Sequence, residues 1–317
     1  MHAVILGAGA LGVYFGGRLL QAGHQVTFLV REKRAKQIKE NGLEVHSIKG
    51  NYVIKNPNVV TNVEDIERID FVFLSVKGYH LKGTVSSLKA LVQKGAYILP
   101  VLNGIEHISI LENELNHLQN EDDRIKRYPV IGGLSFIMAT LDEQGHVHHS
   151  SDQHKLVFGP LHEEQKAFCK ELEEALQDVH IDSERSENIL LQLWDKYMFI
   201  TAFSGVTTTV NLSIGHIRKH SSTFDISVQV LREMKLLANK QGVELNGEHV
   251  NQAVSRMKSL PFDGTSSMHQ DKRKGLVLEL DHLQGGAIRL AEKSGIKVPM
   301  IEFIYHVNKP FESGEPI

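Results

Sequence analysis

Residues 2–12 have the sequence HAVILGAGALG, and this stretch decides the fold. Its first half, His2 to Leu6, is a short apolar run with β-branched residues, which predicts a buried strand. Glycines at positions 7, 9 and 12 follow at once, and a helical pattern continues from Val13 to Gln21. A G-x-G-x-x-G pattern between a strand and a helix is typical of dinucleotide-binding proteins.

Each glycine of this turn has its own physical reason. Gly7 permits the tight turn, Gly9 leaves room for a pyrophosphate against the backbone, and Gly12 lets the helix pack closely on the strand. The helix N-terminus adds N–H groups and the positive end of a dipole. The alternative is a glycine-rich turn that holds no ligand. We expect the cofactor to bind at Gly7, Ala8, Gly9, Ala10, Leu11 and Gly12.

Composition limits the classes of protein to consider. The chain has 317 residues, 41% of them hydrophobic and 23% charged, which is enough for about two ordinary soluble domains. A net charge of −3 predicts no general attraction to nucleic acid. No apolar run approaches the roughly 18 residues of a membrane span, and no secretory signal is expected at the N-terminus. A single cysteine, Cys169, fits a protein of the reducing cytoplasm.

The second predicted strand, Gln25 to Val30, ends at a basic cluster that includes Arg31 and Arg34. In a dinucleotide-binding sheet this strand end faces the adenosine ribose, where an acidic residue favours NAD and an arginine favours the 2′-phosphate of NADP. Because a guanidinium can bind phosphate bidentately, Arg31 predicts NADPH as the cofactor. Glu32 argues against NADPH, because an acidic residue at this strand end favours NAD. The alternative to a phosphate site is that this charged cluster is the solvated start of a helix.

Two more buried strands are predicted at Asp70–Val76 and Ala96–Leu102, with a helix at Leu81–Gln93 between them. Alternating strands and helices indicate a parallel, doubly wound sheet. Ligands of such sheets bind beyond the carboxyl ends of the strands, and Lys77 and Asn103 lie at that edge. The alternative is a surface lysine and a turn-forming asparagine.

Two hairpins complete the N-terminal part. One spans Leu43–Ile48 and Asn51–Lys55, and the other pairs Val130–Thr140 with His146–Phe158, which we expect to close the sheet. Alternation along the last strand divides its histidines between two faces. Because no carboxylate or cysteine stands at ligand spacing, we expect no metal site and interpret the histidines as the polar face of an exposed strand. These histidines are His146, His148, His149 and His154.

After Ser186 strand signals stop and helical patterns take over. The sequence therefore predicts an α/β protein with an N-terminal Rossmann-type doubly wound sheet, residues 1–186, and an all-helical C-terminal domain, residues 187–317. An apolar helical domain of this kind also allows a homodimer. The predicted helices are Asn188–Thr208, Thr223–Gln241, Glu248–Ser259, Gly275–Lys293 and Pro299–Asn308.

Two charged residues interrupt apolar helical stretches of the second domain. Lys196 lies within the run NILLQLWDKYMFI, and Glu279 lies within LVLELD. A lysine is almost never fully buried unless it is paired or lines a cavity. Desolvation lowers the pKa of an ammonium group and makes it a better proton donor near neutrality. The pair is therefore either a structural ion pair or a catalytic lysine with a carboxylate that orients it.

Taken together, these residues are similar to those of the ketopantoate reductase family, the 2-dehydropantoate 2-reductases, over nearly the whole chain. The resemblance depends on several elements in a fixed order, none of which is specific alone. These are the GAGALG opening, Lys77 after DFVFLSV, Leu102-Asn103-Gly104, Trp194-Asp195-Lys196, Ser266-Ser267-Met268-x-Gln270-Asp271, and Glu279 twelve residues after Ser267.

The resemblance implies an NADPH-dependent reduction of a small 2-oxo acid, namely 2-dehydropantoate to pantoate in pantothenate biosynthesis. By matching position, Lys196 would be the general acid that protonates the carbonyl oxygen. Glu279 would hold the reacting groups and contact the cofactor. The resemblance further implies that Ser267 and Asn103 bind the substrate, Asn103 beside the nicotinamide as well, and that Lys77 and Arg31 bind the cofactor.

One departure concerns the substrate. Family members usually carry asparagine four and eight residues after the catalytic lysine, and this chain has Ile200 and Ser204 there. A pocket that loses an amide's hydrogen bonds changes its specificity strongly. One alternative is therefore a related reductase of another, more apolar 2-oxo acid. A second alternative is a catalytically silent, NADPH-binding regulatory protein.

Overall fold

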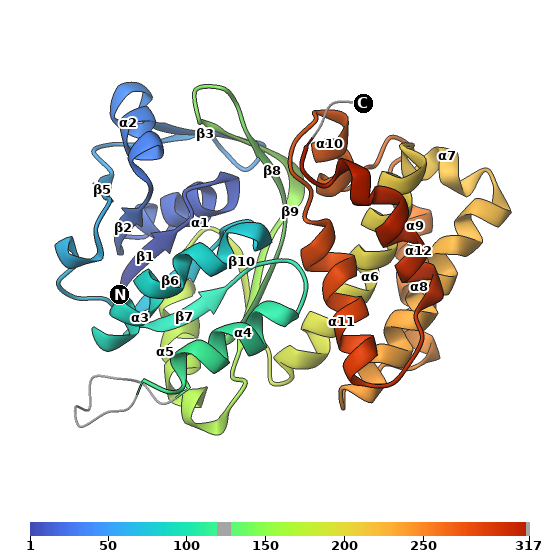
Figure 1. The fold of residues 1–317 in the computed structure, drawn as a ribbon. Helices are drawn as coiled ribbons and strands as arrows, with labels where there is room; N and C mark the ends of the chain where they lie inside the picture. Colours follow the sequence, from blue (N-terminus) through green and yellow to red (C-terminus); the bar gives the residue numbers. More distant parts are fainter. Residues whose placement is uncertain (119–127, 315–317) are drawn as a thin grey trace. The chain divides into compact units, whose positions relative to one another are not determined.

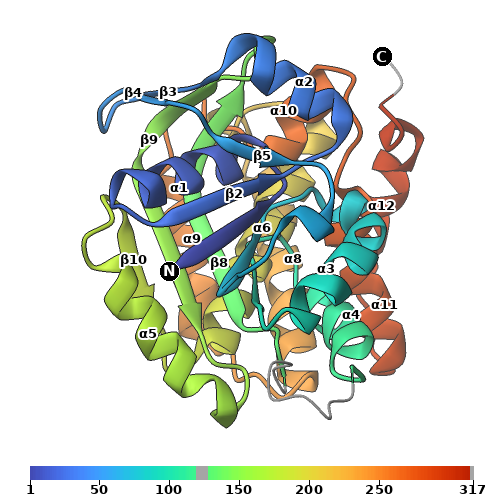
Figure 2. The ribbon, with the colours of Figure 1, turned by 90° about the vertical axis from the view of Figure 1, so that its left-hand side faces the viewer.

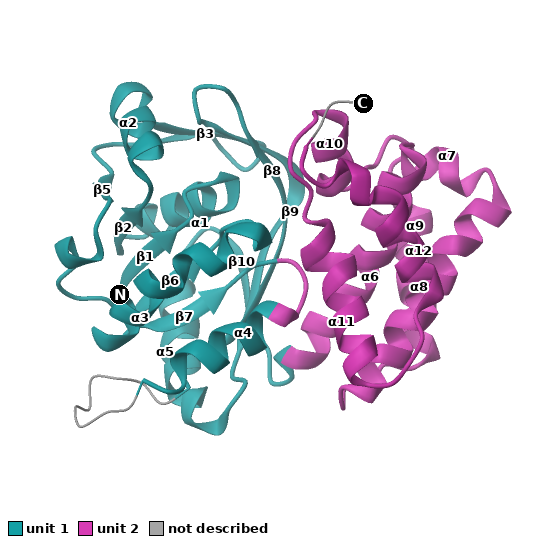
Figure 3. Ribbon diagram, in the orientation of Figure 1, with its two compact units in different colours: residues 1–102, 107–189 teal, residues 103–106, 190–317 magenta. Residues whose placement is uncertain are grey.

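The computed structural model describes residues 1–118 and 128–314. The chain divides into two compact units, shown in Figure 3. Unit 1 comprises residues 1–102 and 107–189, and unit 2 comprises residues 103–106 and 190–317. The sequence places the change of domain after Ser186, whereas the units divide after Ile189 and the short loop 103–106 clusters with unit 2.

The first sheet of unit 1 has five parallel strands in the order β5-β2-β1-β6-β7 (Figures 1 and 2). The strand that precedes the glycine turn, β1, is therefore central, and the predicted doubly wound sheet is confirmed. The strands are β1 (His2–Leu6), β2 (Gln25–Leu29), β5 (Asn58–Val60), β6 (Phe71–Leu74) and β7 (Tyr97–Pro100).

Both faces of this sheet are buried. Along β1, Ala3 and Ile5 belong to the core on one face, while Val4 and Leu6 belong to the core on the other. This alternation explains why the strand is apolar at nearly every position. Helices α1 (Ala10–Gln21) and α5 (Lys166–Leu176) cover the first face, and α3 (Val85–Gln93) and α4 (Glu106–Leu115) cover the second.

The predicted hairpin at residues 130–158 does not simply close the first sheet. Its strands form a second sheet, in the order β10-β9-β3-β4 with β8 paired to β9, and an isolated bridge between Ile98 and Val130 joins the region before β8 to the first sheet. The second sheet packs on α1, where the Tyr14 hydroxyl bonds His154 Nδ1 at 2.8 Å. Its strands are β3 (Leu43–Ser47), β4 (Tyr52–Ile54), β8 (Gly132–Leu141), β9 (Val147–Gly159) and β10 (Asp182–Arg185).

Unit 2 is helical, as the sequence predicts (Figure 1). The predicted helix at Gly275–Lys293 is wrong in its first part, because residues 276–279 form no helix and a π-helical turn, Asp281–Gly285, precedes α11. Within the described residues, no helix combines the length and apolarity that crossing a membrane requires. The helices are α6 (Ile189–Val210), α7 (Ile214–Arg218), α8 (Ser221–Lys240), α9 (Gly247–Ser259), α10 (Ser267–Arg273), α11 (Gly286–Lys293) and α12 (Pro299–Asn308).

Candidate active site

The glycine turn between β1 and α1 has two crowded positions and one open one. Gly7 has φ +107°, and a Cβ there would lie 2.9 Å from the Ser75 backbone. A Cβ on Gly12 would collide with the Gly7 carbonyl oxygen, so α1 packs closely here because position 12 has no side chain. At Gly9 nothing lies within 4 Å of the Cβ position. Gly7 and Gly12 are therefore required by the fold, while Gly9 leaves space beside the backbone.

The N-terminus of α1 offers its backbone N–H groups to a ligand. Gly9 caps the helix without a side chain, and no acidic residue occupies the first turn. Ala8 is buried, and Ala10 and Leu11 are half-buried. The positive end of the helix dipole therefore faces a space that suits a pyrophosphate. Ser75, which the sequence analysis did not identify, stabilises the turn by donating to the Gly7 carbonyl oxygen at 2.8 Å.

The two arginines after β2 have different surroundings. Arg31 is exposed, immediately before α2 (Glu32–Asn41). The Arg34 guanidinium instead donates to the Ala8 carbonyl oxygen at 3.0 Å and to the Gly145 carbonyl oxygen at 2.9 Å. It also bonds Gln37 Oε1. Arg34 thus fixes the backbone of the glycine turn, and Arg31 is the arginine available for a phosphate group.

A second basic group lies near Arg31. Burial lowers the pKa of His80, and the positive charge of Arg31 lowers it further. His80 belongs to the 3₁₀ segment Gly78–Thr84, which starts directly after Lys77, and its N–H donates to the Lys77 carbonyl oxygen at 2.8 Å. Lys77 itself is half-buried. No local sequence pattern distinguishes His80 as a candidate site residue.

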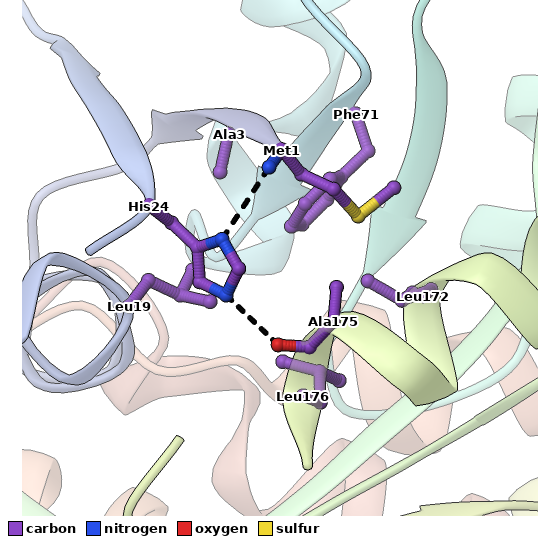
Figure 4. Close-up of a pocket in the computed structure, with 8 residues that line it drawn as sticks. All are labelled: Met1, Ala3, Leu19, His24, Phe71, Leu172, Ala175 and Leu176. Atoms are coloured by element: carbon purple, nitrogen blue, oxygen red, sulfur yellow. Dashed lines mark hydrogen bonds between the residues drawn. The ribbon is translucent and has the colours of Figure 1, made fainter. Parts of the chain in front are cut away.

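A shallow apolar hollow of unit 1 lies at the opposite edge of the first sheet (Figure 4). Ala3 and Phe71, near the amino ends of β1 and β6, line it. Its polar ring, His24, bonds the Met1 amino group at 3.4 Å and the Ala175 carbonyl oxygen at 2.8 Å. Ligands of parallel sheets bind at the carboxyl ends of strands, so this hollow is a packing feature and not a candidate site.

Lys196 lies on α6, where its neighbours Trp194, Tyr197 and Met198 are buried. The lysine is half-buried by accessible surface. Burial lowers the pKa of Lys196 to about 8, although the negative charge of Glu279 raises it. At neutral pH the ammonium is therefore charged but gives up its proton far more readily than an exposed lysine.

Glu279 lies close enough to influence that lysine and is only 6% exposed. It is the last residue of the non-helical segment 276–279, and its carbonyl oxygen accepts the N–H of Leu283 at 3.0 Å. The carboxylate thus stands at the N-terminal end of a helical stretch, where the dipole stabilises negative charge. The prediction of a buried glutamate is confirmed, whereas its placement inside a helix is wrong.

The loop 103–106 packs against the same helical stretch. Gly104 has φ +85°, and a Cβ there would lie 3.2 Å from the His282 carbonyl oxygen. Glu106 forms an ion pair with Arg289 at 2.7 Å. Asn103, half-buried, is therefore held one residue from the contact with His282, which follows Glu279 by three residues. The structure brings Asn103, Glu279 and Lys196 into one part of unit 2.

Ser267 lies near a part of α6 that comes after Lys196 in the chain. It is exposed and begins α10, and its neighbour Ser266 caps that helix by accepting the N–H of His269 at 3.1 Å. The Ser266 hydroxyl lies 3.1 Å from Thr207 Oγ1. Because Thr207 follows Lys196 by eleven residues, the start of α10 is displaced from the lysine by about three helical turns.

Ile200 and Ser204 lie one and two turns after Lys196 on α6, on roughly the same side of the helix. Ile200 is half-buried, and Ser204 is 5% exposed. Between Lys196 and α10, the surface of α6 is therefore apolar at Ile200 and carries a small hydroxyl group at Ser204. This surface suits an apolar ligand group better than a polar one.

The fold and these residues define a two-part oxidoreductase, with a dinucleotide-binding unit followed by a helical unit that carries a lysine and a glutamate. Family comparison agrees: the family described as Ketopantoate reductase PanE/ApbA matches residues 3–163, and its C-terminal counterpart matches residues 188–312. The chain belongs to the ketopantoate reductase family.

Proteins similar to this one match it over nearly its whole length. An uncharacterized oxidoreductase, YkpB of Bacillus subtilis, is 33% identical over 96% of this chain and 97% of its own. A 2-dehydropantoate 2-reductase of Pyrococcus abyssi is 24% identical over 99% of both. Among solved structures, D-mandelate dehydrogenase with NADH and anilino(oxo)acetate has a TM-score of 0.86 and 23% identity, with 98% of each chain covered.

Proposed function

We propose that this protein reduces a 2-oxo acid with NADPH, and that Lys196 is the general acid. The observation that carries the proposal is the half-buried Lys196, whose pKa of about 8 results from burial opposed by the charge of Glu279. A proton donor works best when its pKa lies near the operating pH. Hydride transfer leaves negative charge on the former carbonyl oxygen, and a positioned ammonium both stabilises and protonates that oxygen.

The residues of unit 1 fit NADPH. The N-terminus of α1 and the open position at Gly9 would hold the pyrophosphate, and Arg31 would hold the 2′-phosphate. His80, close to Arg31, would add a second donor there. Lys77, at the carboxyl end of the sheet, would contact the cofactor as well. When bound, NADPH supplies the hydride.

The residues of unit 2 would orient the substrate and move the proton. Lys196 would donate from Nζ to the carbonyl oxygen. Glu279, buried beside it, would keep the ammonium oriented and hold the positive charge in place. Asn103 would offer its side-chain amide to the substrate and the nicotinamide, and Ser267 its hydroxyl to the substrate.

Ketopantoate is the first substrate to test, because curated relatives such as the P. abyssi protein carry that activity in their names. The apolar Ile200 favours a second class, a 2-oxo acid with an apolar side chain. The structural likeness to D-mandelate dehydrogenase suggests an aromatic member, phenyl(oxo)acetate. A pocket with isoleucine in place of an amide loses discrimination for a polar substrate.

The test measures NADPH oxidation by absorbance with ketopantoate and with phenyl(oxo)acetate. Turnover of either supports the reductase, and the ratio of kcat/KM values identifies the preferred class. The variant Ile200→Asn restores an amide and should shift that ratio toward ketopantoate by about 10-fold or more. An unchanged ratio would remove Ile200 from the substrate site.

Lys196→Ala tests the acid itself. It should lower kcat by about 100-fold or more, on the scale of general acid catalysis. NADPH binding, measured by the change in its fluorescence, should remain because the residues proposed to hold the pyrophosphate and the 2′-phosphate lie in unit 1, whereas Lys196 lies in unit 2. Binding of NADPH without turnover of a broad set of 2-oxo acids would instead support the regulatory protein.

The proposed location is the cytoplasm. Cys169 is a buried free thiol, and burial raises its pKa to about 12. A thiol held in its neutral form resists oxidation. As a free thiol, Cys169 does not stabilise the fold through a disulfide bond. A protein stabilised by its core alone fits a reducing compartment.

A further inference from the structure

The outer face of the β3–β9 pair gathers histidines and carboxylates that neither unit's proposed chemistry uses. The two strands run parallel with His46 opposite His148 and Val45 opposite Val147. Side chains alternate along a strand, so Glu44 and His46 share a face with His146 and His148, while the valines point into the core. Strands about one hundred residues apart in sequence thus bring these groups together.

Three of these residues lie at near-ligand separations. One potential ligand atom from each of Glu44, His46 and His146 falls within 4.8 Å of the other two. The Glu44 carboxylate is 3.7 Å from His46 Nε2. Ligand atoms of a tetrahedral zinc ion, each about 2.0–2.1 Å from the metal, are about 3.4 Å apart. Because all three side chains are only half-buried, small rotations can close the remaining gap.

Neighbouring groups orient His146. Its Nε2 lies 3.2 Å from the Asn41 carbonyl oxygen, which can only accept, so this nitrogen carries the proton and Nδ1 keeps its lone pair. A metal-binding histidine typically donates its other ring N–H in this way. Nδ1 faces Asp142 Oδ2 at 3.9 Å, which adds a second carboxylate beside the three ligands.

Asp142 is itself fixed in position. Its Oδ2 lies 3.0 Å from His148 Nε2, and its Oδ1 accepts the backbone N–H of His146 at 2.8 Å. The His148 ring stacks on His46 with centroids 4.9 Å apart. The expectation of no metal site therefore missed two carboxylates: Glu44, which only the strand pairing brings close, and Asp142, four residues before His146.

We propose that Glu44, His46 and His146 bind a divalent transition metal ion of the zinc type, with Asp142 as a fourth ligand or as the partner of a bound water. Two imidazoles with carboxylates suit zinc better than magnesium or calcium, which prefer oxygen ligands alone. The ion would join β3 to the start of β9. It would therefore stabilise the pairing of the two middle strands of the second sheet, independently of the oxidoreductase chemistry.

The test is isothermal titration of the untagged full chain with Zn²⁺ and, separately, with Mg²⁺. The expected result is one tight Zn²⁺ site per chain, no comparable Mg²⁺ binding, and a higher Tm with Zn²⁺. His46→Ala and His146→Ala should each weaken that site by at least about 10-fold and abolish the rise in Tm. Glu44→Gln should likewise weaken Zn²⁺ binding and abolish the rise in Tm. Because this variant keeps the size of the side chain, it tests the site even if the alanine variants misfold.

The matched control is His220→Ala, which removes an exposed histidine of unit 2 and should leave the tight site unchanged. Several weak Zn²⁺ sites in the wild type, or equal Zn²⁺ affinity in the wild type, the three site variants and the control, would overturn the proposal. Activity does not enter this readout, so its outcome is separate from that of the reductase assignment.

Discussion

Tyr197 donates its hydroxyl hydrogen bond to the Leu283 carbonyl oxygen at 2.5 Å. Tyr197 follows Lys196 on α6, and Leu283 lies one turn beyond Glu279. A Cβ on Gly286 would lie 3.3 Å from the same hydroxyl and 3.3 Å from Glu106 Oε2, so α6, the π-helical turn and the loop 103–106 meet here. This buried contact fixes the position of the lysine relative to the glutamate.

Tyr197→Phe should therefore lower kcat by about 10-fold, because small misplacements of catalytic groups are costly. Because the Leu283 carbonyl still accepts the N–H of Gly286, loss of the tyrosine hydrogen bond should reduce the free energy of unfolding by only about 0.5–1.5 kcal/mol. NADPH affinity should not change. Steady-state kinetics and thermal unfolding measure the two effects. Tyr305→Phe, which removes a more exposed hydroxyl bonded to Asp281, is the control and should alter neither.

The pH dependence of reduction should follow the protonation of Lys196. A general acid must carry its proton, so kcat for reduction should fall as the pH rises through about 8. The charge of Glu279 raises the pKa of Lys196, so Glu279→Gln should move this falling limb to lower pH. Glu292→Gln, at an exposed position of α11, should leave the profile in place. If kcat falls at the same pH in the wild type, Glu279→Gln and Glu292→Gln, the falling limb does not report the protonation of Lys196.

Arg31 should determine the preference for NADPH over NADH. Arg31→Ala should raise KM for NADPH by about 10-fold or more, because a charge-assisted pair with phosphate is lost, and should leave KM for NADH nearly unchanged. Lys33→Ala removes an exposed cation two residues further along and serves as the control. Equal changes for both cofactors would exclude a contact with the 2′-phosphate.

The glycine turn allows binding and folding to be separated. Gly9→Ala meets no atom within 4 Å, so the protein should fold with an unchanged Tm while NADPH binding weakens. Gly12→Ala would place its Cβ 2.7 Å from Ser75 Oγ and 2.8 Å from Ile5 Cγ2, so Tm itself should fall. Fluorescence titration and thermal unfolding distinguish the two; an unaltered NADPH affinity in Gly9→Ala would exclude the pyrophosphate from this position.

Local patterns were sufficient for much of this fold. The strand, glycine turn and helix of residues 2–21 are contiguous, so their periodicity and turn chemistry predict them directly. Helix α12 starts at Pro299, which favours the first turn of a helix, and its predicted bounds are confirmed. The helix predicted over Gly275–Lys293 is wrong in its first part because residues 276–279 are mostly apolar yet not helical, and apolar spacing alone does not reveal such a segment.

Long-range pairing accounts for the features that the sequence did not reveal. β3 pairs with β9 across about one hundred residues, so neither the second sheet nor the grouping of Glu44 with His146 follows from spacing along the chain. The same holds for His80 beside Arg31. Lys196 and Glu279 could be identified because charged residues within apolar runs are conspicuous, but their proximity required the structure.

Arg34 ties the glycine turn to the 142–146 turn through two backbone carbonyls, Ala8 and Gly145. Its guanidinium therefore acts as a clamp and not as a ligand group. An engineer who exchanges the segment after β2 to change the cofactor can alter the exposed Arg31 but must keep Arg34. Replacing Arg34 as well would remove the hydrogen bonds that hold the glycine turn in place, and binding of both NADPH and NADH depends on that turn.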